Sequence, residues 1–232
     1  MSKKMFLMSL SLIAGAAVAN PAQAEQAMSF TNQQFVNTDS NVSVVYAGDA
    51  AISGAYEIVD GVSIGASYMD IAEGYIGIGA KWRFHETQSS GLFSGKPGAF
   101  AIAFDYVTGD LGFDIDEEAM GIALLSTSFV NDSFSYSTKI GWETNEVSGH
   151  GMSISDDRFA FGIGGHFQLE GFYADLTFDY AIGDYVDFII LTPTVGKVYG
   201  DFDFSAGLTW VKLAGDADDS DSEFVIKARY NF

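Results

Sequence analysis

The sequence contains no cysteine and few basic residues. Its 232 residues include 11 lysines and arginines against 31 aspartates and glutamates, which gives a net charge of −20. Without cysteine no disulfide framework can form, so backbone pairing and side-chain packing must hold the fold together. Phosphate recognition requires clustered lysine and arginine. We therefore expect no nucleic acid among the partners of this chain.

Beyond its N-terminus the chain lacks an apolar run long enough for a transmembrane helix. The one long run, 5–18, follows two lysines and precedes the small residues that end at Ala24. Crossing a bilayer takes about 20 apolar residues, and this layout is instead that of a secretory signal peptide. We expect 1–24 to be a signal peptide cleaved near Ala24, 25–40 to be a flexible lead, and 41–232 to be the folded domain.

Catalytic signatures are also missing. The chain has neither a G-x-S-x-G nor an H-E-x-x-H motif. Its three histidines are His85, His150 and His166, and Ser153 and Ser155 follow His150 in a segment of small residues that offers no rigid support for a triad. We therefore expect no enzymatic activity and no cofactor.

Aromatic residues, in contrast, are plentiful and recur with a period of two. They make up 15% of the chain, with 20 phenylalanines and 11 tyrosines. Because strand side chains alternate between two faces, this period indicates β-strands. The expected strands are 42–47, 51–59, 62–70, 73–84, 98–107, 119–130, 133–143, 157–168, 171–183, 186–199, 201–213 and 223–232. We predict an all-β fold of about twelve strands, with ten as the alternative count.

The two faces of these strands differ in a way that favours a membrane. In 73–84 one face carries Ile76, Ile78 and Trp82, while the other carries Gly77 and Gly79. Small and polar residues would form a poor core for a soluble sandwich or barrel. In a bilayer the bulky face meets lipid, and only a closed sheet leaves no unpaired backbone there. We predict a single transmembrane antiparallel up-and-down β-barrel.

Turn signals divide the connections into two kinds. Tight-turn pairs at Asp60-Gly61, Asn131-Asp132, Glu170-Gly171 and Gly200-Asp201 follow the second, sixth, eighth and tenth strands, so they lie at one end. The segments 108–118, 144–157 and 214–222 are longer and polar, and we expect them to be loops at the opposite end. This asymmetry is typical of membrane-spanning barrels. The long connection 85–98 does not fit it, because it falls at the end of the short turns.

Charged residues on the small-residue face are expected to line the lumen. The candidates are Lys81, Arg83, Asp105, Lys139, Arg158, Asp175, Asp179, Lys227 and Arg229. A water-filled lumen with such charges would steer small polar solutes. In the alternative interpretation, these charges pair across a plugged lumen, with Lys81 and Arg83 beside Asp105, and Arg158 beside Asp175.

Two expected loops are rich in carboxylates. The segment 216–223 contains Asp216, Asp218, Asp219 and Asp221, and 114–118 holds a second cluster. Carboxylate oxygens can bind Ca²⁺ or Mg²⁺, but the EF-hand spacing is absent. A solvated acidic loop is the favoured interpretation. Loosely bound Ca²⁺ or Mg²⁺ that bridges the loops to lipopolysaccharide is the alternative.

The last strand carries a further signal. The chain ends in FVIKARYNF, with Tyr230 and the final Phe232 on its apolar face. This ending resembles the C-terminal recognition signal of bacterial outer-membrane β-barrel proteins, except that Lys227 or Ala228 stands where a glycine is usual. The resemblance implies a Gram-negative outer membrane, contact with its lipid and lipopolysaccharide, and recognition of the last strand by the barrel-assembly machinery.

The resemblance also frames the expected function. It implies a narrow porin-like channel for passive diffusion of small solutes, and the alternative is a non-conducting structural or surface-interaction barrel with acidic outer loops. In size the chain is similar to twelve-stranded channels for acidic sugars, such as the oligogalacturonate porins. Those channels depend on strongly basic lumen tracks. Here interior acids balance or exceed the bases, so we do not expect acidic sugars as solutes.

Overall fold

The computed structural model describes residues 38–47, 49–70, 74–87, 98–110, 112, 114–215 and 219–232. These residues form twelve strands: β1 (Asn41–Ala47), β2 (Asp49–Val59), β3 (Val62–Met69), β4 (Tyr75–Thr87), β5 (Gly98–Asp110), β6 (Ile115–Asn131), β7 (Phe134–Gly149), β8 (Met152–Leu169), β9 (Phe172–Gly183), β10 (Val186–Tyr199), β11 (Phe202–Gly215) and β12 (Asp219–Asn231). In this described part of the chain, no helix is long and apolar enough to cross a membrane.

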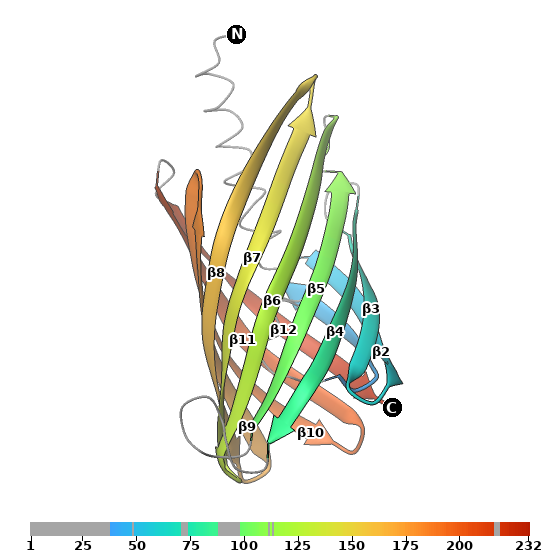
Figure 1. Ribbon diagram of the computed structural model, residues 1–232. Coiled ribbons are helices and arrows are strands. Elements are labelled where there is room, and N and C mark those ends of the chain that lie inside the picture. The colour runs from blue at the N-terminus through green and yellow to red at the C-terminus, as the bar shows by residue number, and fades with distance from the viewer. Residues whose placement is uncertain are drawn as a thin grey trace.

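The strands close into a single antiparallel barrel (Figure 1). Each strand pairs with its neighbours in sequence, and β1 pairs with β12 from Asn41 opposite Asn231 to Ala47 opposite Val225. This last pairing removes the open edges that an unclosed sheet would expose. The predicted fold class and the count of twelve strands are confirmed.

The outer surface of the barrel is apolar. On β4, Ile76, Ile78 and Trp82 are more than half exposed, whereas Lys81 is 1% exposed. The same alternation places Phe161 and Ile163 of β8 on the outside and buries Ala160. Large contiguous apolar surfaces are unusual on soluble monomers, but they match the hydrocarbon of a bilayer. The face predicted to meet lipid is therefore the outward face.

Aromatic rings form a band around one end of this outer surface. Three pairs of rings mark it, with centroid distances of 4.7 Å for Phe134 and Phe167, 4.9 Å for Phe202 and Tyr230, and 5.7 Å for Trp82 and Phe84. Amphipathic and aromatic side chains gather where a membrane meets water. This band therefore corresponds to an interfacial girdle of the kind that flanks the apolar belt of membrane barrels.

The same end carries the short turns, and we call it the turn rim. Its four tight turns are Asp60–Gly61, Asp132–Ser133, Glu170–Gly171 and Gly200–Asp201. Gly61, Gly171 and Gly200 have φ values of 79°, 77° and 60°, a backbone conformation that glycine adopts without strain. The second turn lies one residue later than predicted, because Asn131 ends β6 and its side-chain oxygen accepts a hydrogen bond from the Ser133 N–H.

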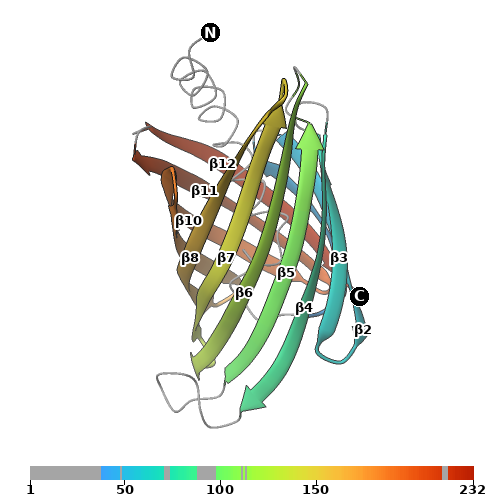
Figure 2. The same ribbon diagram turned by 45° about the horizontal axis from the view of Figure 1, so that its top comes forward.

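At the opposite end the expected loops are largely strands, which corrects the prediction. Segment 108–118 is mostly β5 and β6, segment 144–157 is the tip of β7 and β8 with a tight turn at 150–151, and β12 begins at Asp219. The strands β6, β7 and β8 have 17, 16 and 18 residues, compared with 7 in β1. Their projecting ends, 115–119, 144–149 and 152–157, form a tall wall on one side of the barrel (Figure 2).

The long connection at the turn rim is only partly described. β4 continues to Thr87 and β5 begins at Gly98, so both ends of the predicted 85–98 segment belong to strands. The remaining residues, 88–97, lie outside the described residues.

Candidate channel lumen

Small side chains line the inner face of β5 to β8. Ala101, Ala103 and Leu125 are fully buried or nearly so, and Ala55 of β2 packs against their cluster. In the register between β2 and β4, Ala55 lies opposite Gly65, which lies opposite Gly79. Because these two glycines have no side chains, β2 can approach β5 across the lumen. The lumen is therefore narrow on this side.

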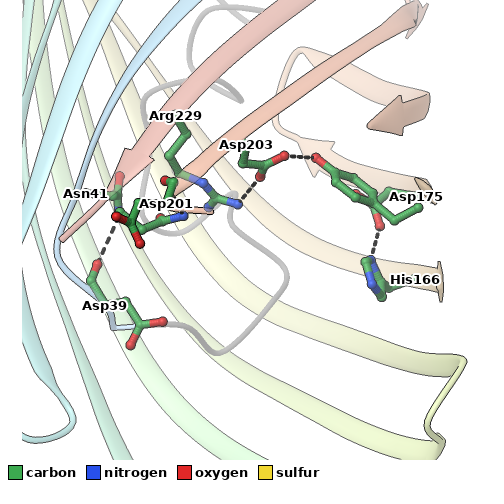
Figure 3. A network of polar contacts seen from close by, with 9 residues as sticks. Asp39, Asn41, His166, Asp175, Asp201, Asp203 and Arg229 are labelled. Carbon is green, nitrogen blue, oxygen red and sulfur yellow. Dashed lines mark hydrogen bonds and ion pairs between the residues drawn. The ribbon is translucent and has the colours of Figure 1, made fainter. Parts of the chain in front are cut away.

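A network of polar contacts in the lumen lies near the turn rim (Figure 3). Arg229 of β12 donates a hydrogen bond of 2.6 Å to Asp203 of β11, and the Tyr173 hydroxyl of β9 donates one of 2.6 Å to the other oxygen of the same carboxylate. Asp203 is buried, and Arg229 is partly exposed. The network therefore ties three strands together on the inner wall.

Tyr173 reaches Asp203 because of a glycine on the strand between them. A Cβ atom at Gly196 of β10 would lie 2.2 Å from the Tyr173 ring. The ring therefore covers the bare backbone of β10. An equivalent arrangement occurs on the other side of the barrel, where the Tyr75 ring of β4 covers Gly109 of β5.

In this second arrangement the acceptor is Glu117 of β6. The Tyr75 hydroxyl donates a hydrogen bond of 2.8 Å to Glu117, and the Asn145 side chain of β7 donates one of 2.6 Å. All three side chains are buried. Neither tyrosine–carboxylate pair was predicted from the sequence. The available signal was an inward-facing tyrosine at the first or second residue of a strand, with a glycine at the paired position of the next strand.

Asp175 pairs with His166, not with Arg158 as the plugged-lumen interpretation predicted. His166 Nδ1 lies 2.6 Å from Asp175 Oδ1 (Figure 3). The register between β8 and β9 explains this, because it places His166 opposite Asp175 and Arg158 opposite Gly183. Arg158 instead donates to Asp156 at 2.7 Å, and its guanidinium lies 4.4 Å from the centre of the Phe188 ring.

Lys139 is a buried cation of the lumen wall. Its ammonium lies 3.1 Å from Asp179 of β9 and 3.9 Å from Glu143 on its own strand. The Lys139 side chain is only 2% exposed, and a buried ammonium of this kind is stable only when it is paired. The sequence placed Lys139 and Asp179 in the lumen, and the structure brings them together.

The remaining predicted cations gather toward the turn rim. Lys81 is buried, and its charge is repelled by Lys227 and Arg229 of β12 and attracted by Asp105. Arg83 donates to the exposed Asp60 of the first turn at 2.9 Å. Lys81 thus has Asp105 nearby, as the plugged-lumen interpretation predicted. The contact described for Arg83 is instead with Asp60 of the turn rim.

The N-terminal end of the described chain also enters the turn rim. Thr38 is 1% exposed, and its hydroxyl donates a hydrogen bond of 2.9 Å to Glu57. The same carboxylate accepts a bond of 2.8 Å from the Gly61 N–H, and the Glu57 N–H donates to the Ser40 hydroxyl at 2.9 Å. Glu57 therefore anchors the start of the barrel to the first turn.

The four predicted metal-binding residues belong to the start of β12 or lie outside the described residues. Asp216 and Asp218 belong to 216–218, which is not described. Asp219 and Asp221 begin β12. The described residues contain no group of three or more histidine, cysteine or carboxylate side chains placed to hold a metal ion.

The aromatic residues of the predicted assembly signal lie on the outer surface. Tyr230 and Phe232 are 40% and 63% exposed, and their ring centroids are 6.0 Å apart. The Phe232 N–H donates to the Ser40 carbonyl at 3.1 Å, next to the pairing of β1 with β12. The signal thus lies at the closing seam of the barrel.

The two histidines whose side chains the structure describes lie at opposite ends of β8. His150 is at the tip of the β7–β8 hairpin with a φ of 51°, beside a small apolar hollow that Ile115, Val147 and Ile154 help to line. His166 lies in the lumen at the opposite end of β8. The side chain of His85 lies outside the described residues.

Comparison with known proteins identifies the fold. The NanC porin superposes with a TM-score of 0.57 at 7% identity, covering 83% of this chain and 98% of that chain. The KdgM porin gives 0.54 at 8% identity, and its complex with disordered oligogalacturonate gives 0.55 at 8%, each covering 84% of this chain and 99% of that chain. No family model and no curated protein matches the sequence. The chain therefore has the fold of small outer-membrane porins.

Proposed function

We propose that this protein is a narrow porin-like channel for passive diffusion of small solutes across the outer membrane of a Gram-negative bacterium. The observation that carries the proposal is a closed twelve-strand barrel with an apolar exterior and an interior of glycine, alanine, serine and charged side chains. Such an interior is suited to water and polar solutes. The turn rim would face the periplasm and the tall wall would face outward, as in other barrels of this class.

The charge of the interior supports a preference among solutes. KdgM has been solved with oligogalacturonate, which is polyanionic. In the present lumen, Lys139 and Arg229 are both engaged by carboxylates. Further acids, among them Glu143 and Glu223, also face inward. We therefore propose that cations and small neutral solutes pass more readily than anionic sugars.

Conductance of the refolded protein in a planar bilayer tests this function. We expect steady single-channel currents and a reversal potential that indicates cation preference. Asp179→Asn leaves the Lys139 ammonium without its nearest carboxylate, so the cation-to-anion permeability ratio should fall roughly two- to fivefold, the effect of about 1 kcal/mol from one charge. Asp157→Asn on the outer face of β8 is the matched control and should leave the ratio unchanged. The absence of current after verified insertion would falsify the proposed channel function.

A second candidate function is a non-conducting barrel that serves a structural or surface-interaction role. The observation in its favour is the burial of inward-facing side chains, since Ala101, Leu125 and Ser137 are each 0% exposed and Ala55 packs across the lumen. A barrel of this size can be filled by its own side chains. The same conductance measurement separates the two functions, because a filled barrel passes no current. We propose no catalytic role and no cofactor for either.

We further propose that the chain is exported and that 1–24 is cleaved near Ala24. In this proposal 25–40 forms a lead before the barrel, and the barrel-assembly machinery recognises the last strand.

If the last strand is recognised in this way, Phe232→Ala should remove most of the barrel from the outer membrane of expressing cells. The refolded protein should lose no more than about 2 kcal/mol of stability, because only one lipid-facing ring is removed. Equal losses in cells and in refolding would instead indicate a packing role for Phe232.

Outer-membrane lipid and lipopolysaccharide are the remaining proposed partners. Lipid would cover the apolar belt. The outward side of the tall wall carries acids in directly opposed pairs, Asp110 opposite Asp116 and Glu118 opposite Glu146. Opposed like charges repel each other. Loosely held Ca²⁺ or Mg²⁺ between these acids and lipopolysaccharide phosphates would relieve the repulsion.

A further inference from the structure

Inward-facing cations are concentrated in one half of the lumen. The inward-facing cations within about six residues of a strand end at the turn rim are Lys81, Arg83, Lys139, Lys227 and Arg229, and we call this part the turn half. In the rest of the described lumen, the far half, the inward-facing lysine or arginine is Arg158. The distribution of positive charge along the barrel axis is therefore strongly uneven.

The cation of the far half is already matched by a carboxylate. Arg158 lies 2.7 Å from Asp156, and its side chain is 11% exposed. This cation therefore contributes little net positive charge to the far half.

Further carboxylates in the far half have no such cation beside them. On β12, Asp221 and Glu223 share the inward face with Lys227, and on β2, Asp49 shares it with Ala51. The charges of Asp221 and Asp49 act on Glu223, and one buried oxygen of Glu223 has no hydrogen-bond partner. Asp221 is exposed to solvent. This acidic group therefore borders the opening of the lumen opposite the turn rim, beside the shorter strands β1, β2 and β3.

The turn half has a different balance of positive and negative charge. Arg229 is paired with Asp203 at 2.6 Å, and Lys139 lies 3.1 Å from Asp179. Lys227 lies near Arg229, Asp203 and Asp175, and Lys81 is repelled by both Lys227 and Arg229. Cationic and anionic groups therefore nearly cancel in the turn half, with an excess of positive charge around Lys81 and Lys227.

We infer that this lumen conducts unequally in the two directions, with the larger current when the tall-wall side is positive. This inference rests on the proposed channel function. Fixed negative charge concentrates mobile cations in the far half, and focusing inside a narrow low-dielectric wall strengthens the effect. When cations are driven from the far half toward the turn half, they accumulate with anions entering from the turn rim, and current rises. The opposite polarity depletes both ions between the two halves.

Current–voltage curves of single insertions in symmetric KCl test the inference. In about 0.1 M KCl, where charges act over about 10 Å, the two polarities should differ at least about twofold in current. In about 1 M KCl screening shortens this range to about 3 Å, so the ratio should approach one. Insertions in opposite orientations should give mirror-image curves, so the ratio is scored for each insertion separately.

Two triple variants locate the charges responsible. Asp49→Asn with Asp221→Asn and Glu223→Gln removes the inward acids, and the current ratio should fall to near one. The matched control is Glu118→Gln with Glu146→Gln and Asp157→Asn, which removes three charges from the outward face of the tall wall and should keep the ratio of the unmodified protein.

The outcomes separate the inference from the function on which it rests. A conducting protein with linear curves in 0.1 M KCl would overturn the inference and leave the channel standing. An equal loss of asymmetry in both triple variants would also overturn it, because the charges responsible would not be those of the lumen. If the inserted protein passed no current, both the proposed channel function and the proposed asymmetry of its current would be overturned.

Discussion

Replacing Ile163 with lysine should destabilise the folded barrel by about 2–4 kcal/mol, the cost of a lysine on the lipid face near the middle of a bilayer. Ile163 is 54% exposed on the outside of β8, between Phe161 and Phe167. An ammonium there would have to leave water or bend toward a distant interface. Urea titration of the barrel refolded in lipid vesicles, followed by tryptophan fluorescence, measures the change.

The matched control places the same residue on the inner face at nearly the same height. Thr177 of β9 pairs with Gly164, next to Ile163, and its side chain shares the inward face with Asp175 and Asp179. A lysine at 177 would meet water and two carboxylates, so Thr177→Lys should cost less than about 1 kcal/mol. A larger loss from Thr177→Lys than from Ile163→Lys would mean that the inner and outer faces are reversed.

Removing the Asp203 carboxylate should have the second large effect. Asp203→Ala leaves the Arg229 guanidinium and the Tyr173 hydroxyl without the acceptor that both share. Breaking a buried ion pair typically costs about 3–5 kcal/mol, and the partial exposure of Arg229 favours the lower figure, about 3 kcal/mol. The same urea titration in vesicles gives the free energy of unfolding.

Two further variants separate the parts of this effect. Tyr173→Phe removes only one hydrogen bond to Asp203 and should cost about 1 kcal/mol. Asp201→Ala changes an exposed aspartate in the adjoining turn and should stay within about 0.5 kcal/mol of the unmodified protein. If Asp203→Ala were no more costly than Asp201→Ala, the network would not contribute to stability.

The number of strands and the outward residues could be predicted because lipid imposes a strict pattern. On β4, Ile76, Ile78 and Trp82 alternate with small or charged residues, and the structure places them on the outer face. Turn glycines such as Gly171 and Gly200 marked the correct rim. Where both faces of a strand lie beyond the lipid, this pattern disappears, although the backbone pairing continues.

This loss of pattern explains why the tall wall was predicted to be loops. The pairing of β7 with β8 continues through Glu146 opposite Ser155 and Ser148 opposite Ser153, which make the outward face polar, while Val147 lies opposite Ile154 on the inward face. The outward apolar alternation by which the other strands were predicted is therefore missing from these ends. Their pairing depends on the register that begins lower in the barrel, with Trp142 opposite Phe159.

The lumen was predicted as a set of residues but not as a set of pairs. Alternation shows that the side chains of Arg158 and Asp175 both face the lumen. Which side chains pair there depends on the register between neighbouring strands, and this register cannot be derived from a single sequence. In the structure Asp175 pairs with His166, and Arg158 pairs with Asp156. The tyrosine–glycine contacts depend on the same register and were missed for the same reason.

The pairing of β1 with β12 also has a consequence for the order of folding. Asn41 lies opposite Asn231, so the closing step joins positions 190 residues apart, whereas the other strand pairs join consecutive segments. Closing so long a loop is entropically unfavourable and slow compared with hairpin formation. The hairpins can form in any order, but the barrel cannot close until the last strand has been synthesised and delivered. Until then both terminal edges remain open, and an incomplete chain is a template for aggregation.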